Sequence, residues 1–381
     1  MTGTEPLGGA LWLRPGAARP HNLRSTRPDW VGRVTRGLPV SRLPATLGSL
    51  FSLCGHAHIA CASMAVDAAR GRAEPPSAVA RERLALQTLR EHLRRIWIDW
   101  PRQLAATPVP DTVIDEAARV LAQGPAFAST PADATTWLEV QAIGMPLRAW
   151  LDAWEQDPHA WLTTWCRQAT GPLPALMRHC RAAASGDLPD VAPLRVHADA
   201  GTLRTWAARL QANGAAFARQ PSWQGDCAET GVWTRLNEAA RPRLNTPWLR
   251  LGARLAEVVR LALPAEDESS PTRCGTAWLG MGALPLAAGE AIAWVEMARG
   301  LLMHHVQLDG AGESACIAAC HVIAPTEWNF HADGAVARVL ERLPTPPSAE
   351  GRHRLAAVMA SYDPCVPYQL DHQTSREAAH A

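Results

Sequence analysis

The chain has 381 residues, of which 47% are hydrophobic and 19% charged, so it can bury a sizeable core and is not a disordered chain. Its 37 basic and 36 acidic residues give a formal net charge of +1, and no surplus of charge points to nucleic acid or to an anionic membrane surface. The start of the sequence lacks a signal peptide, no apolar run is long enough to span a membrane, and the nine scattered cysteines are odd in number. We therefore expect a cytoplasmic protein with reduced thiols and no membrane span.

The N-terminal residues 5–40 are rich in Gly, Pro and Arg and contain short alternating apolar pieces, which predict a small β-hairpin or edge sheet. Helical spacing of apolar residues then begins at Leu43 and continues to Ala69. This change of pattern predicts two parts, an N-terminal β-rich segment over 1–42 and a helical domain over 43–381.

The next helix is expected to begin after Ser77, a candidate N-cap, and to end or kink at Pro101. Its polar face includes Glu91 and Arg95, which are spaced as an i,i+4 ion pair on the solvent side. Asn213-Gly214 predicts the end of a later helix. Further helices are expected over 111–123, 145–155, 159–169, 174–184 and 200–213, from Thr246-Pro247, as a short piece after Gly289, and over 333–343 and 350–361.

A β-hairpin is predicted over 300–325, where two strand-like runs flank the turn signal Asp309-Gly310. On its second strand Cys316 and Cys320 share one face and His321 takes the other, which favours buried thiols over a metal site. The predicted fold class is therefore mainly α with small β pieces, an α+β arrangement.

Two cysteines stand in tight-turn contexts near opposite ends of the chain, Cys54 before Gly55 and Cys365 after Asp363-Pro364. A lone cysteine on an apolar helix face is usually an inert core residue. Cys54, His58 and Cys61 also fall on one helical face at i, i+4 and i+7, and would bind zinc if a fourth ligand arrived. These readings stay open on the residues alone.

The two cysteine segments resemble the metal-binding ends of the large subunit of nickel–iron hydrogenases, which carry Cys-Gly-x-Cys and Asp-Pro-Cys-x-x-Cys. Three other stretches resemble the same family in the same order, Glu229–Arg235, Glu296–Gly300 and Pro325–Asn329. The resemblance implies a helical core like that of a hydrogenase large subunit, with Cys54 and Cys365 brought together.

The chain departs from that family at the second cysteine of each pair, where Ala57 and Tyr368 stand. This pattern resembles the HupK/HoxV-type hydrogenase accessory proteins, which are maturation factors related to the large subunit. The resemblance implies a non-enzymatic scaffold that transiently binds iron as Fe(CN)2(CO) through Cys54 and Cys365, and no nickel. A divergent hydrogenase catalytic subunit and a zinc- or redox-linked helical protein are the alternatives.

The same resemblance implies roles around the iron for three further residues. Arg299 matches an arginine near the diatomic ligands, and Pro325 and Thr326 match a segment that contacts a cyanide. An ordinary salt bridge and an ordinary turn are the alternatives at these positions. The family also implies two partners, a small HypC-type maturation chaperone and the hydrogenase large subunit as acceptor.

Overall fold

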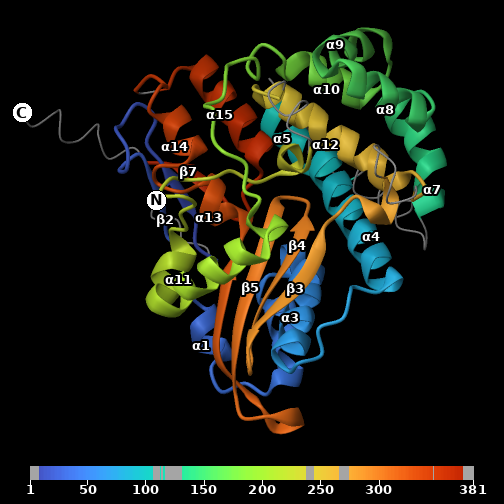
Figure 1. Cartoon of the computed structure of the whole chain (residues 1–381). Coiled ribbons are helices and arrows are strands. Elements are labelled where there is room, and N and C mark those ends of the chain that lie inside the picture. Colours follow the sequence, from blue (N-terminus) through green and yellow to red (C-terminus); the bar gives the residue numbers. More distant parts are fainter. Residues whose placement is uncertain are drawn as a thin grey trace, which may run out of the picture.

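The computed structural model describes residues 8–105, 112, 115, 131–236, 244–265, 274–345 and 347–371 of the chain. Helices surround a four-stranded antiparallel sheet, and a second, three-stranded sheet lies near both ends of the chain (Figure 1). The longer helices are α2 Leu43–Leu50, α3 Gly55–Ala69, α4 Ala78–Arg94, α8 Leu147–Gln156, α9 Pro158–Gln168, α10 Pro172–Cys180, α11 Ala200–Arg219, α12 Pro247–Ala262 and α15 Ala349–Tyr362. The shorter ones are α1 Val31–Thr35, α5 Trp100–Leu104, α7 Pro131–Trp137, α13 Pro325–Asn329 and α14 Ala335–Leu340.

The larger sheet has the strand order β3-β4-β5-β6 and confirms the predicted hairpin as its last two strands. Its strands are β3 Met281–Ala287, β4 Glu290–Met297, β5 Gly300–Asp309 and β6 Cys316–Ile323. Helix α3 packs on one face, and the core beneath α11 covers the other (Figure 1). Successive side chains of a strand point to opposite faces of the sheet. Accordingly, Ile292 of β4 belongs to the core with α11, and its neighbour Ala293 belongs to the core with α3.

The prediction of a short helix after Gly289 is wrong, since Glu290–Met297 is strand β4. Its run of small and apolar residues lacks the alternation of a half-exposed strand because both faces of the sheet are covered. A short apolar run of this kind cannot be told from a buried helix by periodicity alone.

The N-terminal hairpin is confirmed as β1 Leu11–Leu13 and β2 Leu23–Ser25, which pair antiparallel. The sequence pattern did not indicate its third strand, β7 Tyr368–Leu370, which pairs in parallel with β1. The two ends of the described chain are therefore joined by one small sheet.

The helix predicted from Leu43 to Ala69 is broken. Its halves, Val40–Leu50 and Ser52–Ala69, meet at an angle of 102°, and the second half begins with the short 3-10 turn η2 Ser52–Cys54. Two glycines make the sharp approach possible, because a Cβ on Gly55 would lie 2.5 Å from the carbonyl oxygen of Gly48. Among the described residues no single helix is long and apolar enough to cross a membrane, although this bent pair meets that test by length and composition.

The other predicted helices are largely confirmed. Ser77 caps α4, with its hydroxyl accepting from the backbone N–H of Ala80 at 3.2 Å. Helical structure continues past Pro101 for only one turn, to Leu104. The predicted stop at Gly214 is confirmed as a break in α11, because this glycine has the non-helical φ of 45° and ψ of −123° and a second helical piece follows it. The helix predicted over 111–123 lies almost entirely outside the described residues.

Helix α12 is buried along its whole length, which the one-sided apolar pattern of its sequence did not predict. It contacts α4, α7, α8, α9 and α15 (Figure 1). Its charged side chains are paired with other segments: Arg250 with Glu229 at 2.8 Å and Arg254 with Asp363 at 3.1 Å. Buried charges are tolerated when they are paired and hydrogen-bonded in this way.

Candidate metal-fragment site

A cavity of about 1000 Å³ brings together the five residues to which the family resemblance assigns a role around the iron. Cys54, Cys365, Arg299, Pro325 and Thr326 all line it, although they come from four separate stretches of the chain. Their roles toward a metal stay predictions.

Cys54 lies at the break between the two halves of the bent helix pair and is 4% exposed. Burial raises the pKa of its thiol to about 12, although the nearby Arg299 acts in the opposite direction. The side chain is therefore a protonated thiol at neutral pH in the free protein. Binding of a metal would displace that proton, since the thiolate is the ligand.

Cys365 follows α15 through a turn that Asp363 sets. Asp363 caps the helix in the left-handed region, with φ of 54° and ψ of 69°, a conformation that Asp tolerates better than most residues. Its carboxylate contacts Arg95 at 2.7 Å, Arg254 at 3.1 Å and Arg299 at 3.5 Å. Burial by itself would raise the pKa of Asp363, but these three arginines outweigh it and hold the pKa at about 2.

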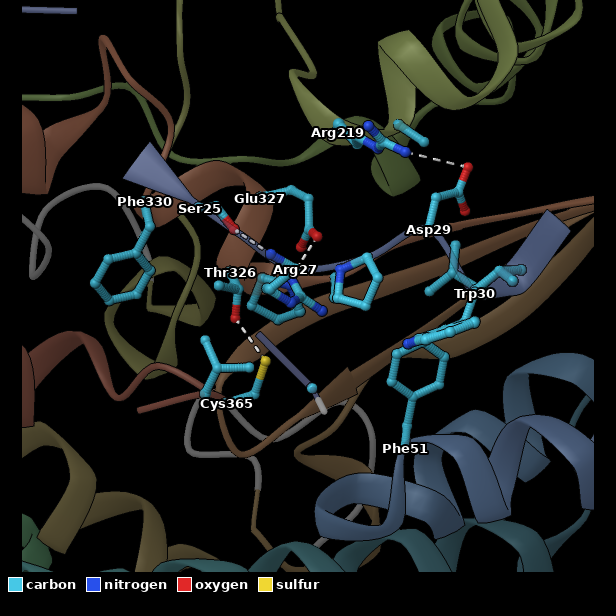
Figure 2. Close-up of a pocket in the computed structure, with 18 of the residues that line it drawn as sticks. Ser25, Arg27, Asp29, Trp30, Phe51, Arg219, Thr326, Glu327, Phe330 and Cys365 are labelled. Atoms are coloured by element: carbon cyan, nitrogen blue, oxygen red, sulfur yellow. Dashed lines mark hydrogen bonds and ion pairs between the residues drawn. The ribbon is translucent and has the colours of Figure 1, made fainter. Parts of the chain in front are cut away.

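A hydroxyl lies directly beside the Cys365 sulfur. Thr326, at the start of α13, places its Oγ1 3.0 Å from the Sγ of Cys365 and is 4% exposed (Figure 2). Pro325 precedes it and begins the helix, a position that suits its fixed φ. The Pro-Thr segment is therefore packed against the second cysteine.

Arg299 lies in the turn between β4 and β5 and is 2% exposed. Its Nη1 donates to Glu91 Oε2 at 2.8 Å, and its pKa is raised despite burial because Asp363 and Glu91 lie next to it. Glu91 was predicted on the solvent side of α4, and that prediction is wrong: its side chain is 10% exposed and faces Arg299. The expected partner Arg95 instead pairs with Asp99 and Asp363.

The buried Glu91 carboxyl also lies 3.4 Å from the ring of His56. Burial raises the pKa of Glu91 to about 7, with Arg299 opposing the shift, and burial lowers the pKa of His56 to about 4. Burial therefore shifts the carboxyl that contacts Arg299 toward its protonated form.

Sequence reasoning missed an ion pair inside the cavity, between Arg27 and Glu327 (Figure 2). Both side chains are 16% exposed. Glu327 occupies the variable position of the Pro-Thr-x-Trp-Asn stretch, and Arg27 belongs to the loop after β2. No spacing in the sequence links two residues so far apart, so only the fold could reveal the pair.

The zinc set proposed from helical spacing is not assembled. His58 instead contacts His304, with Nδ1 and Nε2 3.1 Å apart, and stacks on Phe51 with ring centroids 4.0 Å apart. Within the described part of the chain, no three His, Cys, Asp or Glu side chains are grouped so that they could hold a metal ion. On β6, Cys320 is buried as predicted and Cys316 is half-buried.

Comparisons with known proteins point in one direction. No protein-family model matches the sequence. The chain is 43% identical over 376 residues to the hydrogenase expression/formation protein HoxV of Cupriavidus necator, covering 97% of each chain. It is 32% identical over 359 residues to the hydrogenase expression/formation protein HupK of Bradyrhizobium diazoefficiens, covering 92% of this chain and 91% of that one.

Among solved structures, the chain is similar to an NAD+-reducing [NiFe]-hydrogenase, with a TM-score of 0.52 and 16% identity over 95% of this chain and 97% of the other. A likeness at this identity shows the fold alone. It confirms the predicted fold class, an α+β arrangement like that of nickel–iron hydrogenase large subunits.

Proposed function

The chain belongs to the HoxV/HupK family of hydrogenase expression/formation proteins, and from this premise we propose that it is a scaffold for the iron fragment of a hydrogenase. The proposed cargo is Fe(CN)2(CO), held transiently before it passes to the hydrogenase large subunit. The observation that carries the proposal is the meeting of Cys54 and Cys365 on one cavity beside a buried guanidinium and a hydroxyl.

The donor set suits this cargo. Low-spin Fe(II) with two cyanides and one carbonyl has three of six positions filled, and thiolates are suitable soft ligands for two of the others. The Arg299 guanidinium is fixed by Glu91 and is available to stabilise the partial negative charge on a cyanide nitrogen. Thr326 and Pro325 line the side of the cavity at Cys365 and would meet the second cyanide.

The same set of ligands would also allow the iron fragment to be released. Ala57 and Tyr368 supply no thiolate, so the fragment is held by two sulfurs where a hydrogenase large subunit offers four. A better-equipped acceptor therefore removes it. Without the two bridging thiolates a nickel–iron centre cannot be completed, which argues against a divergent catalytic subunit and for a non-enzymatic role.

This scheme requires two partners, and we propose that the protein meets them in the cytoplasm. Two thiolates and three diatomic ligands leave one position on iron open. A HypC-type chaperone docked over the cavity would fill it with a third thiolate. Departure of that thiolate would begin transfer to the hydrogenase large subunit.

The proposal is tested by infrared spectroscopy of protein purified anaerobically from its host, where carbonyl and cyanide stretches lie clear of protein bands. We expect these bands in the natural protein and their loss in Cys54→Ala and Cys365→Ala. Cys166→Ala is the matched control, since Cys166 is also buried but lies on α9, away from the cavity. If both cavity variants keep the bands and mature the hydrogenase fully, the cysteines are core residues and the scaffold mechanism is wrong.

A further inference from the structure

We infer that Arg27 is a specificity-determining residue of the cavity, which keeps bare divalent cations away from Cys54 and Cys365 and favours an iron fragment that carries cyanide. Its effect on the iron fragment rests on the proposed function, whereas its effect on bare cations does not. The residue reaches the cavity from the N-terminal loop after β2.

The position of Arg27 supports this role. In Figure 2 its side chain lies between the Glu327 carboxylate and the Cys365 sulfur. Burial opposes the charge of Arg27, but its ion pair with Glu327 acts against burial and its pKa is raised, so the guanidinium stays charged. Both cavity sulfurs lie close enough to interact with that charge once they are thiolates, the form in which they would bind a metal. Arg299 also acts on Cys54, so two positively charged guanidiniums line the cavity together with the two thiols.

The charges of the possible occupants differ. A Ni²⁺ ion held by two thiolates has a net charge of zero, so the two guanidiniums do not stabilise it. The free Ni²⁺ ion is repelled by both guanidiniums. In Fe(CN)2(CO) the two cyanides already neutralise Fe(II), so the fragment held by two thiolates carries a charge of −2. That charge complements Arg27 and Arg299.

Arg27 also forms an ion pair with Glu327, whose carboxylate would otherwise attract a cation. Glu327 lines the cavity, and carboxylate oxygens are ordinary ligands of divalent metals. While the Glu327 carboxylate is paired with Arg27, its negative charge is offset and does not attract a cation into the cavity. The same pair therefore excludes cations in two ways.

The test measures binding of Ni²⁺ alone by anaerobic titration calorimetry on the reduced protein. We expect Arg27→Gln to bind Ni²⁺ about tenfold more tightly or better than the natural protein, since it removes a nearby positive charge and leaves the negative charge of Glu327 without its partner. Arg27→Lys keeps the charge and should bind Ni²⁺ as weakly as the natural protein. Arg72→Gln is the control for net charge, because Arg72 is exposed, pairs with Asp67 and does not line the cavity.

A second readout uses the same variants purified from the host. The carbonyl and cyanide bands per chain should fall severalfold in Arg27→Gln and be kept in Arg27→Lys, and circular dichroism verifies that each variant is folded. Unchanged nickel affinity in folded Arg27→Gln, or a tenfold gain in Arg27→Lys, would overturn the inference. If Arg27→Gln gains nickel but the natural protein never shows the bands, the inference about cations stands and the proposed scaffold function fails.

Discussion

Asp363 connects the turn that carries Cys365 to three arginines, so removing its charge tests whether it organises the site. Asp363→Asn keeps the shape of the side chain and its tolerance of the left-handed backbone but leaves Arg95, Arg254 and Arg299 with less negative charge. We expect the free energy of unfolding to fall by about 3–5 kcal/mol, as when one partner of a buried ion pair is removed. Urea unfolding followed by circular dichroism measures it.

The control is Asp67→Asn, which breaks an exposed pair with Arg72 at 2.8 Å and should change stability by less than about 1 kcal/mol. Equal losses in the two variants would show that Asp363 does not organise the site.

The pH dependence of stability should follow from the same residue. The pKa of Asp363 is about 2 in the folded protein against an ordinary value of 3.8, so its carboxylate favours the folded state. This contribution is fully present above pH 3.8 and is lost as the pH falls toward 2. The difference in unfolding free energy between the natural protein and Asp363→Asn should therefore shrink over that window, and a constant difference would contradict the assignment.

At the scale of elements, the bend between α2 and α3 places Cys54. Gly55→Ala would put a Cβ 2.5 Å from the carbonyl oxygen of Gly48, and that backbone atom cannot move without opening the bend. We expect a loss of about 1–3 kcal/mol in unfolding free energy and displacement of Cys54, seen as a decrease in carbonyl and cyanide bands. Gly186→Ala meets only the tip of Arg354 at 3.8 Å and should have neither effect.

Sequence reasoning found most helices and the hairpin because caps, prolines and apolar spacing are local signals. It failed where neighbours decide the structure. Strand β4 has both faces covered, and the charged residues of α12 are buried because partners arrive from distant segments. In the site, motifs identified Cys54 and Cys365, whereas the pairing of Arg27 with Glu327 depends on the fold and left no local pattern.

At the scale of the whole molecule, strand β7 holds the segment that carries Cys365. The backbone N–H of Leu11 donates to Pro367 at 2.9 Å, and that of Asp371 donates to Leu13 at 2.9 Å. Gln369→Pro removes an N–H from the middle of this parallel pairing and should loosen Cys365. We expect a loss of carbonyl and cyanide bands with a nearly unchanged helical circular dichroism signal.

Gln369→Ala is the control, because it keeps the backbone N–H and changes only an exposed side chain. If the proline variant keeps its bands, the pairing of β7 with β1 is not needed to position the second cysteine.

Because β1 pairs with β7, the site can be completed only late in synthesis. A growing chain displays Cys54 and the N-terminal hairpin early, while Cys365 and β7 are among the last residues described to leave the ribosome. Domains generally begin to fold from the N-terminus as they emerge. The cavity therefore lacks its second sulfur until the segment that carries Cys365 has been made and paired with β1. Under the proposed scaffold function, a nascent or prematurely stopped chain offers a single thiolate and does not compete with finished molecules for the iron fragment.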